Sequence, residues 1–258
     1  MPENDYQIIT INENNIDQEH ICCAIGNDKV NQNRANMKKA WLKCRMPYGH
    51  TFKKINVRGK VFIEYVPAEQ AWFPIEAKGY QLIQCFWVSG RYKGQGLGKM
   101  LYQACEEDSI KTNGLIAVTS AKKRPFLVDK KFLVKQGFTV CDTAPPYFEL
   151  VVKQFDKTAP LPKFTAKAKS AKYKGHGDLV FFYSDLCPFN HDFVEILSKI
   201  AEEKNFTVEK NKITTLEQAQ SLPIATGNFS LFYNGEFQTH EIMPEKKFAK
   251  FLDELKKR

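Results

Sequence analysis

The stretch WVSGRYKGQGLGK, residues 87–99, decides the fold of the first half of the chain. The apolar run before it, residues 80–88, predicts a buried strand, and the apolar period of residues 97–107 predicts a helix behind it. The glycines between them (Gly90, Gly94, Gly96 and Gly98) let the backbone turn sharply and approach a ligand closely. Because a helix begins with unpaired N–H groups and the positive end of its dipole, this turn predicts an anion site suited to phosphate.

The spacing of these residues excludes two common phosphate-binding patterns. A dinucleotide-binding fold needs G-x-G-x-x-G after its first strand, and a P-loop needs G-x-x-x-x-G-K-[ST]. Arg91-x-x-Gly94-x-Gly96 instead matches R/Q-x-x-G-x-G/A, with Lys93 and Lys99 as nearby positive charges. In this signature the stretch resembles the GNAT acetyltransferases. The alternative is a glycine-rich turn between strand and helix that binds no ligand.

The order of the predicted elements carries the same resemblance over residues 6–155. We expect β, α, β, β, β, α, β, α, β, β, including a helix over residues 28–45, the strand 80–88, and a helix over residues 125–136 that ends at Gly137. This is the GNAT order, and GKVFIEYVPAE (59–69) and PPYFEL (145–150) are similar to its YoaP-type branch. The resemblance implies an α/β (α+β) fold whose mixed sheet is flanked by helices.

Composition divides the chain into three parts. We expect the acetyltransferase-like domain over residues 1–156, a basic linker over 157–177 and a second domain over 178–258. The linker segment has six lysines and no acid, which favours a solvated hinge and leaves nucleic-acid binding as an alternative.

The second domain starts with a buried strand, DLVFFY, and the turn SDLCPFN that leads into a helix. The predicted order of strand, Cys-Pro turn, helix, strand, helix, hairpin and helix resembles a small thioredoxin-like α/β domain of the YoaP type. Cys187 would lie at a helix N-terminus, where the dipole favours the thiolate. Asn190 occupies the place of the second cysteine of Cys-x-x-Cys, and Gly227 is the nearest match to the expected cis-proline. Cys187 is therefore a lone thiol for redox or thiol binding, or a remnant in a binding module.

The GNAT resemblance implies acetyl transfer from acetyl-CoA to an amine. Backbone N–H groups of residues 93–98 would hold the pyrophosphate, and the strand ending at Val88 would splay from its neighbour and bind the pantetheine arm. The predicted acetyl-CoA site consists of Trp87, Val88, Arg91, Tyr92, Lys93, Gly94, Gln95, Gly96, Leu97, Gly98 and Lys99.

The catalytic groups are less well marked. The family often places a base on the strand before the loop, but residues 80–85 have no carboxylate, so Glu64 and Glu69 are the candidates. The usual acid is a tyrosine five residues before the glycine of the GF pair, where this chain has Leu133. Tyr147 is the predicted substitute. For each residue the alternative is an ordinary structural side chain.

Composition sets the remaining expectations. No run of 18 apolar residues and no signal peptide occur, and seven scattered cysteines favour reduced thiols, so we expect a soluble cytoplasmic protein without a metal site. The net charge of +9 fits cofactor phosphates and the basic linker, which makes a nucleic-acid partner unfavoured. Besides an N-acetyltransferase, a non-catalytic acyl-CoA sensor and a thiol-handling protein that uses Cys187 stay open, as do the acceptor amine and the oligomeric state.

Overall fold

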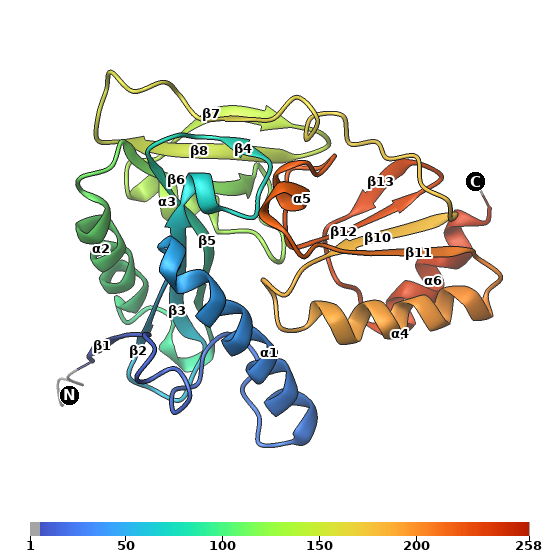
Figure 1. Cartoon of the computed structure of the whole chain (residues 1–258), viewed down its shortest axis with the longest axis horizontal. Helices are drawn as coiled ribbons and strands as arrows, with labels where there is room; N and C mark the ends of the chain where they lie inside the picture. The colour runs from blue at the N-terminus through green and yellow to red at the C-terminus, as the bar shows by residue number, and fades with distance from the viewer. Residues whose placement is uncertain (1–5, 258) are drawn as a thin grey trace. The chain divides into compact units, whose positions relative to one another are not determined.

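The computed structural model describes residues 6–257, which belong to two compact units (Figure 1). The first unit contains the chain up to Ala71, Ile75–Thr143 and Tyr147–Lys163. The second unit starts at Phe164 and also contains the short segments Trp72–Pro74 and Ala144–Pro146. Among residues 6–257, no helix has both the length and the apolar character needed to cross a membrane.

The first unit is built on a seven-stranded mixed sheet in the order β1-β2-β3-β5-β6-β8-β7. Neighbouring strands β5 and β6 are parallel, whereas the pairs β1–β2, β2–β3, β3–β5 and β6–β8 are antiparallel. The strands are β1 (Ile8–Thr10), β2 (Thr51–Ile55), β3 (Val61–Pro67), β5 (Tyr80–Val88), β6 (Gly114–Ser120), β7 (Thr139–Ala144) and β8 (Phe148–Gln154). Two short strands, β4 (Ile75–Glu76) and β9 (Lys163–Phe164), form a separate pair.

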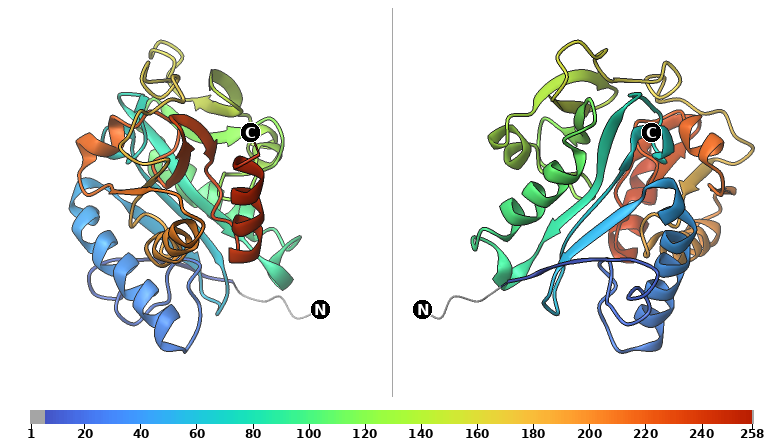
Figure 2. Two further views of the ribbon diagram at one scale, coloured as in Figure 1. Left: turned by 90° about the vertical axis from the view of Figure 1, so that its right-hand side faces the viewer. Right: turned by 60° about the vertical axis from the view of Figure 1, so that its left-hand side comes forward.

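Three α-helices and three short 3₁₀ turns accompany this sheet. The α-helices are α1 (Lys29–Arg45), α2 (Leu97–Ser109) and α3 (Lys130–Lys135), and the 3₁₀ turns are η1 (Met46–Tyr48), η2 (Ala68–Gln70) and η3 (Gly90–Tyr92). Figure 2 shows α1 and α2 on opposite faces of the sheet. Alternation along β3 explains this, because Ile63 and Tyr65 belong to the same apolar cluster as α2, whereas Glu64 contacts Lys38 of α1.

Helix α3 differs from its prediction at one end. The predicted helix begins at Pro125, but the structure begins it at Lys130, where the side chain of Asp129 accepts the N–H groups of Lys131 and Phe132. Phe126 has a φ of 62°, which is outside the helical region. The C-terminal end is close to the prediction, since Gly137 adopts a left-handed φ of 92° two residues after the helix.

The second unit has its own sheet in the order β11-β10-β12-β13. Its strands are β10 (Leu179–Tyr183), β11 (Val208–Lys212), β12 (Phe229–Tyr233) and β13 (Glu236–Thr239), and its helices are α4 (Asn190–Glu203), α5 (Leu216–Gln220) and α6 (Glu245–Leu255). Apolar residues of β10, α4 and α6 form one buried cluster. The element order agrees with the predicted one, while the likeness to thioredoxin remains a prediction.

Most of the segment predicted as a solvated hinge is packed in the second unit. Phe164 and Ala168 are buried, and the Tyr173 N–H donates to the Gly235 carbonyl at 2.9 Å. The Tyr173 ring also meets Phe182 edge-on, with ring centroids 4.7 Å apart. The lysines of this segment are mostly exposed, while Phe164 and Ala168 between them are buried. Counting charges alone does not reveal these buried positions.

Candidate functional site

The turn between β5 and α2 is open to a ligand. Gly90, Gly94 and Gly96 have φ values of 57°, 77° and 79°, which L side chains rarely adopt. A Cβ atom added at any of the three would meet nothing within 4 Å. Gly96 is the N-cap of α2 and has no side-chain cap, and the first helical turn contains no acid. The N–H groups at the start of α2 therefore have an anion-binding geometry that no acidic side chain of that turn opposes.

Strands β5 and β6 separate just before this turn. Their pairing runs from Tyr80 opposite Gly114 to Ile83 opposite Ala117 and stops there. Beyond that point β5 continues to pair with β3, and β6 continues to pair with β8. The splay predicted for the strand that ends at Val88 is confirmed.

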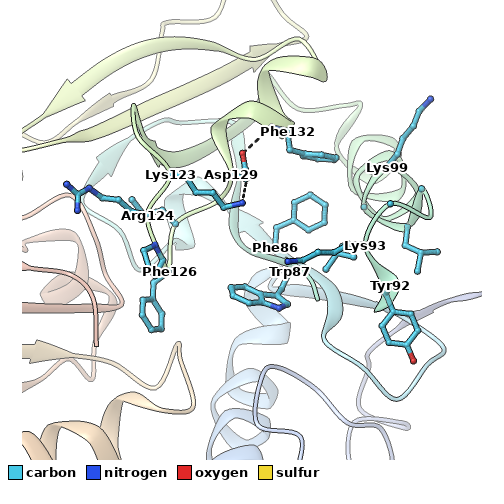
Figure 3. A pocket seen from close by; sticks show the side chains of 17 residues that line it. Phe86, Trp87, Tyr92, Lys93, Lys99, Lys123, Arg124, Phe126, Asp129 and Phe132 are labelled. Carbon is cyan, nitrogen blue, oxygen red and sulfur yellow. Dashed lines mark hydrogen bonds and ion pairs between the residues drawn. The ribbon is translucent and has the colours of Figure 1, made fainter. Parts of the chain in front are cut away.

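A pocket of about 650 Å³ opens beside the turn (Figure 3). One wall is the end of β5 with the loop and the start of α2; the other is the segment between β6 and α3. Between the walls, Phe86 and Phe132 meet edge-on, with ring centroids 5.0 Å apart. Trp87 and Phe126 are 43% and 41% exposed, which is high for residues of their size. The lining is Phe86, Trp87, Val88, Tyr92, Lys93, Gly94, Gly96, Leu97, Gly98, Lys99, Lys123, Arg124, Pro125, Phe126, Leu127, Asp129 and Phe132.

Two predicted site residues shape the loop instead of lining the pocket. The Arg91 guanidinium lies over the Tyr92 ring and donates to its hydroxyl at 3.0 Å. Gln95 donates to the Arg91 carbonyl and accepts the Tyr6 hydroxyl at 2.6 Å. The other nine predicted residues line the pocket.

The far wall of the pocket was not predicted. Lys123 pairs with Asp129 at 2.6 Å, and the Arg124 guanidinium lies 3.7 Å from the centre of the Tyr147 ring. The run of cations at residues 122–124 is a sequence signal that could have pointed to this wall. This wall was missed because a helix was predicted over residues 125–136, whereas residues 125–129 form a loop that lines the pocket.

None of the predicted catalytic residues lines the pocket. Glu64 is 1% exposed, and both its carboxylate oxygens accept from the Lys38 ammonium, at 2.7 and 3.0 Å. This position differs from the one expected of a base, because the carboxylate is buried in an ion pair and lies outside the pocket lining. Glu69 is exposed and accepts the Gly79 N–H at 2.7 Å. Tyr147 is half-buried beneath Arg124.

The Lys38–Glu64 pair belongs to a buried polar network. Gln84 donates from Nε2 to Glu64 at 2.8 Å and lies 3.4 Å from Nδ1 of His50, whose Nε2 lies 3.3 Å from the Gln70 carbonyl. Burial, together with the nearby Lys38 charge, lowers the pKa of His50 to about 3. The neutral ring fits the network, with its proton on Nε2 toward the carbonyl and Nδ1 accepting from Gln84.

In the second unit, Cys187 lies half-buried in the turn between β10 and α4. Asn190 fixes this turn, because its Nδ2 donates to the carbonyls of Ser184 and Asn228 at 2.7 and 2.8 Å. At Gly227 an added Cβ would lie 1.4 Å from the carbonyl oxygen of Trp72, so a proline has no room there.

Two further features describe the surroundings of the thiols. The Asp185 carboxylate, two residues before Cys187, pairs with Lys212 at 2.9 Å. Cys44 on α1 is exposed, whereas Cys22 and Cys105 are buried.

The fold and pocket together define an α/β protein whose glycine turn at a helix start opens into a pocket lined by aromatic, glycine and basic residues. The model of the YoaP-like family matches residues 209–250. Over 249 residues, 96% of this chain and 98% of the relative, the chain is 39% identical to the "uncharacterized N-acetyltransferase YoaP" of Bacillus subtilis (strain 168). The chain belongs to this YoaP-like family.

Solved structures resemble the chain only distantly. A putative GNAT-family acetyltransferase from Desulfovibrio desulfuricans is 12% identical with a TM-score of 0.40, and covers 58% of this chain and 99% of its own. The PaiA N-acetyltransferase of Thermoplasma acidophilum, in complex with coenzyme A, is 15% identical with a TM-score of 0.40, at 58% and 98% coverage. The putative acetyltransferase YncA of Salmonella typhimurium, with acetyl-CoA, is 14% identical with a TM-score of 0.41, at 61% and 98%. All three TM-scores are below 0.5, so these structures assign no function to this chain.

Proposed function

We propose that this protein is an acetyl-CoA-dependent N-acetyltransferase that acts on an amine. The observation that carries the proposal is the open glycine turn at the start of α2, placed where β5 leaves β6. The 39% identical relative, which is named as an N-acetyltransferase, supports the same class.

The pocket offers distinct surfaces to the parts of acetyl-CoA. N–H groups of residues 93–98 and the positive end of the α2 dipole suit the pyrophosphate, and Lys93 and Lys99 add charge. The apolar side chains of Phe86, Val88 and Phe132 suit the pantetheine arm. Backbone groups of β5 beyond Ile83 suit its amides, and an N–H there would polarise the thioester carbonyl.

The reaction needs a neutral amine and a proton for the leaving group. The amine nitrogen attacks the thioester carbonyl, a C–N bond forms, and the C–S bond breaks to release the CoA thiolate. Glu69 is the remaining candidate to accept the amine proton, because Glu64 is buried and paired with Lys38. Tyr147 is the candidate donor to the thiolate, and the Arg124 guanidinium lies over its ring.

Steady turnover tests the function. Wild-type protein is incubated with acetyl-CoA and a panel of small amines, peptides with a free N-terminus and lysine-containing peptides, and released CoA is measured with a thiol reagent. We expect turnover with at least one acceptor class. Tight acetyl-CoA binding without turnover across the panel would favour the acyl-CoA sensor instead.

Glu69→Gln tests the proposed base. We expect kcat to fall about 100-fold while CoA affinity is unchanged, and the acid limb of the pH–rate profile to disappear. Glu76→Gln is the matched control, since Glu76 is another exposed glutamate of the same connection. Full activity in Glu69→Gln would mean that water or the substrate itself takes the proton.

A further inference from the structure

The buried polar network of the first unit lies outside the pocket and takes no part in the proposed chemistry. Lys38 and Glu64 are each 1% exposed and 2.7 Å apart, and Gln84 is nearly buried beside them. Taking two charges and an amide out of water is costly, and apolar residues of the same volume would often be as stable. Such a network therefore points to a role other than stability.

The network sits where the sheet is irregular. The register of β3 against β5 shifts between Glu64 and Tyr65. On the other edge of β5, the pairing with β6 ends at Ile83. Gln84 is the next residue, so the Glu64–Gln84 hydrogen bond of 2.8 Å joins β3 to β5 at the point where β5 leaves β6.

The bond is anchored on both sides. Lys38 holds both oxygens of Glu64 and lies 4.2 Å from the centre of the Trp41 ring, which ties the pair to α1. His50 faces the same Gln84 amide from the other direction. Beyond Ile83, β5 lacks the support of β6, so these side chains take over part of the positioning that strand pairing supplies elsewhere.

We propose that the hydrogen bond from Gln84 to residue 64 holds β5 on its divergent course and thereby sets the affinity for acyl-CoA, while Lys38 balances the Glu64 charge. The proposal rests on the proposed function of the pocket. Glu64 is then a positioning residue that acts through Gln84, and the splay between β5 and β6 is a preformed feature of the free protein.

Two double variants isolate the hydrogen bond to Gln84. In both, Lys38→Met removes the ammonium, so that no unpaired lysine is left buried. With Glu64→Gln, the new amide can accept from Gln84 Nε2 and donate to Gln84 Oε1, which has no hydrogen-bond partner among residues 6–257. With Glu64→Leu, the volume is similar but the bond is lost.

CoA affinity by calorimetry is the first measurement. We expect K38M/E64Q to bind CoA within threefold of wild type and K38M/E64L to bind it at least tenfold more weakly. The matched control is Lys54→Met with Glu19→Leu, which removes another largely buried pair, 2.6 Å apart, without touching β5. We expect that control to bind like wild type. Equal affinity in the Gln and Leu variants would overturn the proposal.

Hydrogen exchange in the absence of CoA is the second measurement. We expect the β5 amides at residues 84–88 to exchange at least tenfold faster in K38M/E64L than in K38M/E64Q, with α2 unchanged. Equal exchange would overturn the positioning role. Wild-type protein that binds no CoA would refute the proposed function, and the exchange comparison would still decide what the network does to β5.

Discussion

Two of the turns that lead from a strand into a helix, the one between β5 and α2 and the one between β10 and α4, are built in opposite ways. Between β5 and α2, the glycines have left-handed φ values and empty space above them. Between β10 and α4, no glycine occurs, and the Asn190 side chain donates to the carbonyls of Ser184 in the same turn and of Asn228 before β12. Neither helix has a side-chain cap at its N-cap residue, Gly96 or Phe189.

The difference lies in what occupies the helix start. The first turn of α2 has no acid and contains Lys99, so its electrostatics favour an anion from outside the chain. The first turn of α4 contains Asp192, and Asn190 fills the space inside the turn. The same strand–turn–helix pattern thus yields an open glycine turn in one unit and a turn filled by the Asn190 side chain in the other.

The largest expected effect is at the open turn. Gly96→Asp places a carboxylate at the N-cap of α2, and we expect CoA affinity to fall at least 100-fold, about 2.7 kcal/mol. We expect stability to fall by about 1 kcal/mol, because an L residue at a φ of 79° is strained. Gly90→Asp is the control, because Gly90 also has a positive φ and open space but does not line the pocket. Calorimetry that gives Gly96→Asp the same affinity as Gly90→Asp would refute the anion site.

A substitution in the turn between β10 and α4 should lower folding stability and leave CoA affinity unchanged. Asn190→Ala removes an amide that donates to the Ser184 and Asn228 carbonyls, and we expect the second unit to lose about 2 kcal/mol. Gln95→Ala in the open turn is the counterpart, since Gln95 is exposed, and its loss should cost less than about 0.5 kcal/mol. Hydrogen exchange in denaturant, followed in α4 and α2, measures both. A larger loss from Gln95→Ala would reverse the comparison.

Cysteine labelling sharpens the comparison further. We expect Cys187 to react with iodoacetamide about tenfold faster than Cys141 at pH 8, because burial raises the pKa of Cys141 to about 11 and leaves little thiolate. Exposed Cys44 is the reference for access alone. Cys187 slower than Cys44 at every pH would mean that the helix start does not activate the thiol. Cys187→Ser should leave CoA binding unchanged.

Local patterns predicted much of this fold. The bounds of β5 follow from one apolar run, and α1 begins after Asp28, whose side chain caps it as such residues do. The helix predicted over residues 125–136 began too early because apolar spacing outweighed the cap signal of Asp129.

What the sequence hid are pairings between distant residues. The sequence alone leaves Glu64 as a candidate base, because it does not show that Lys38, 26 positions earlier, pairs with the Glu64 carboxylate. The far wall of the pocket depends in the same way on a loop folding back over the glycine turn. Residue spacing in a single sequence carries no record of such contacts.

The neutral His50 beside Lys38 gives the first unit a sensitivity to acid. Its pKa is about 3 in the folded protein and about 6.5 in an unfolded chain, so between these values the unfolded chain binds a proton that the folded one does not. Folding stability therefore falls as pH falls through this window, by about 2 kcal/mol at pH 5 from this group alone. The cluster that holds β5 away from β6 is thus also where mild acidification should first loosen the first unit.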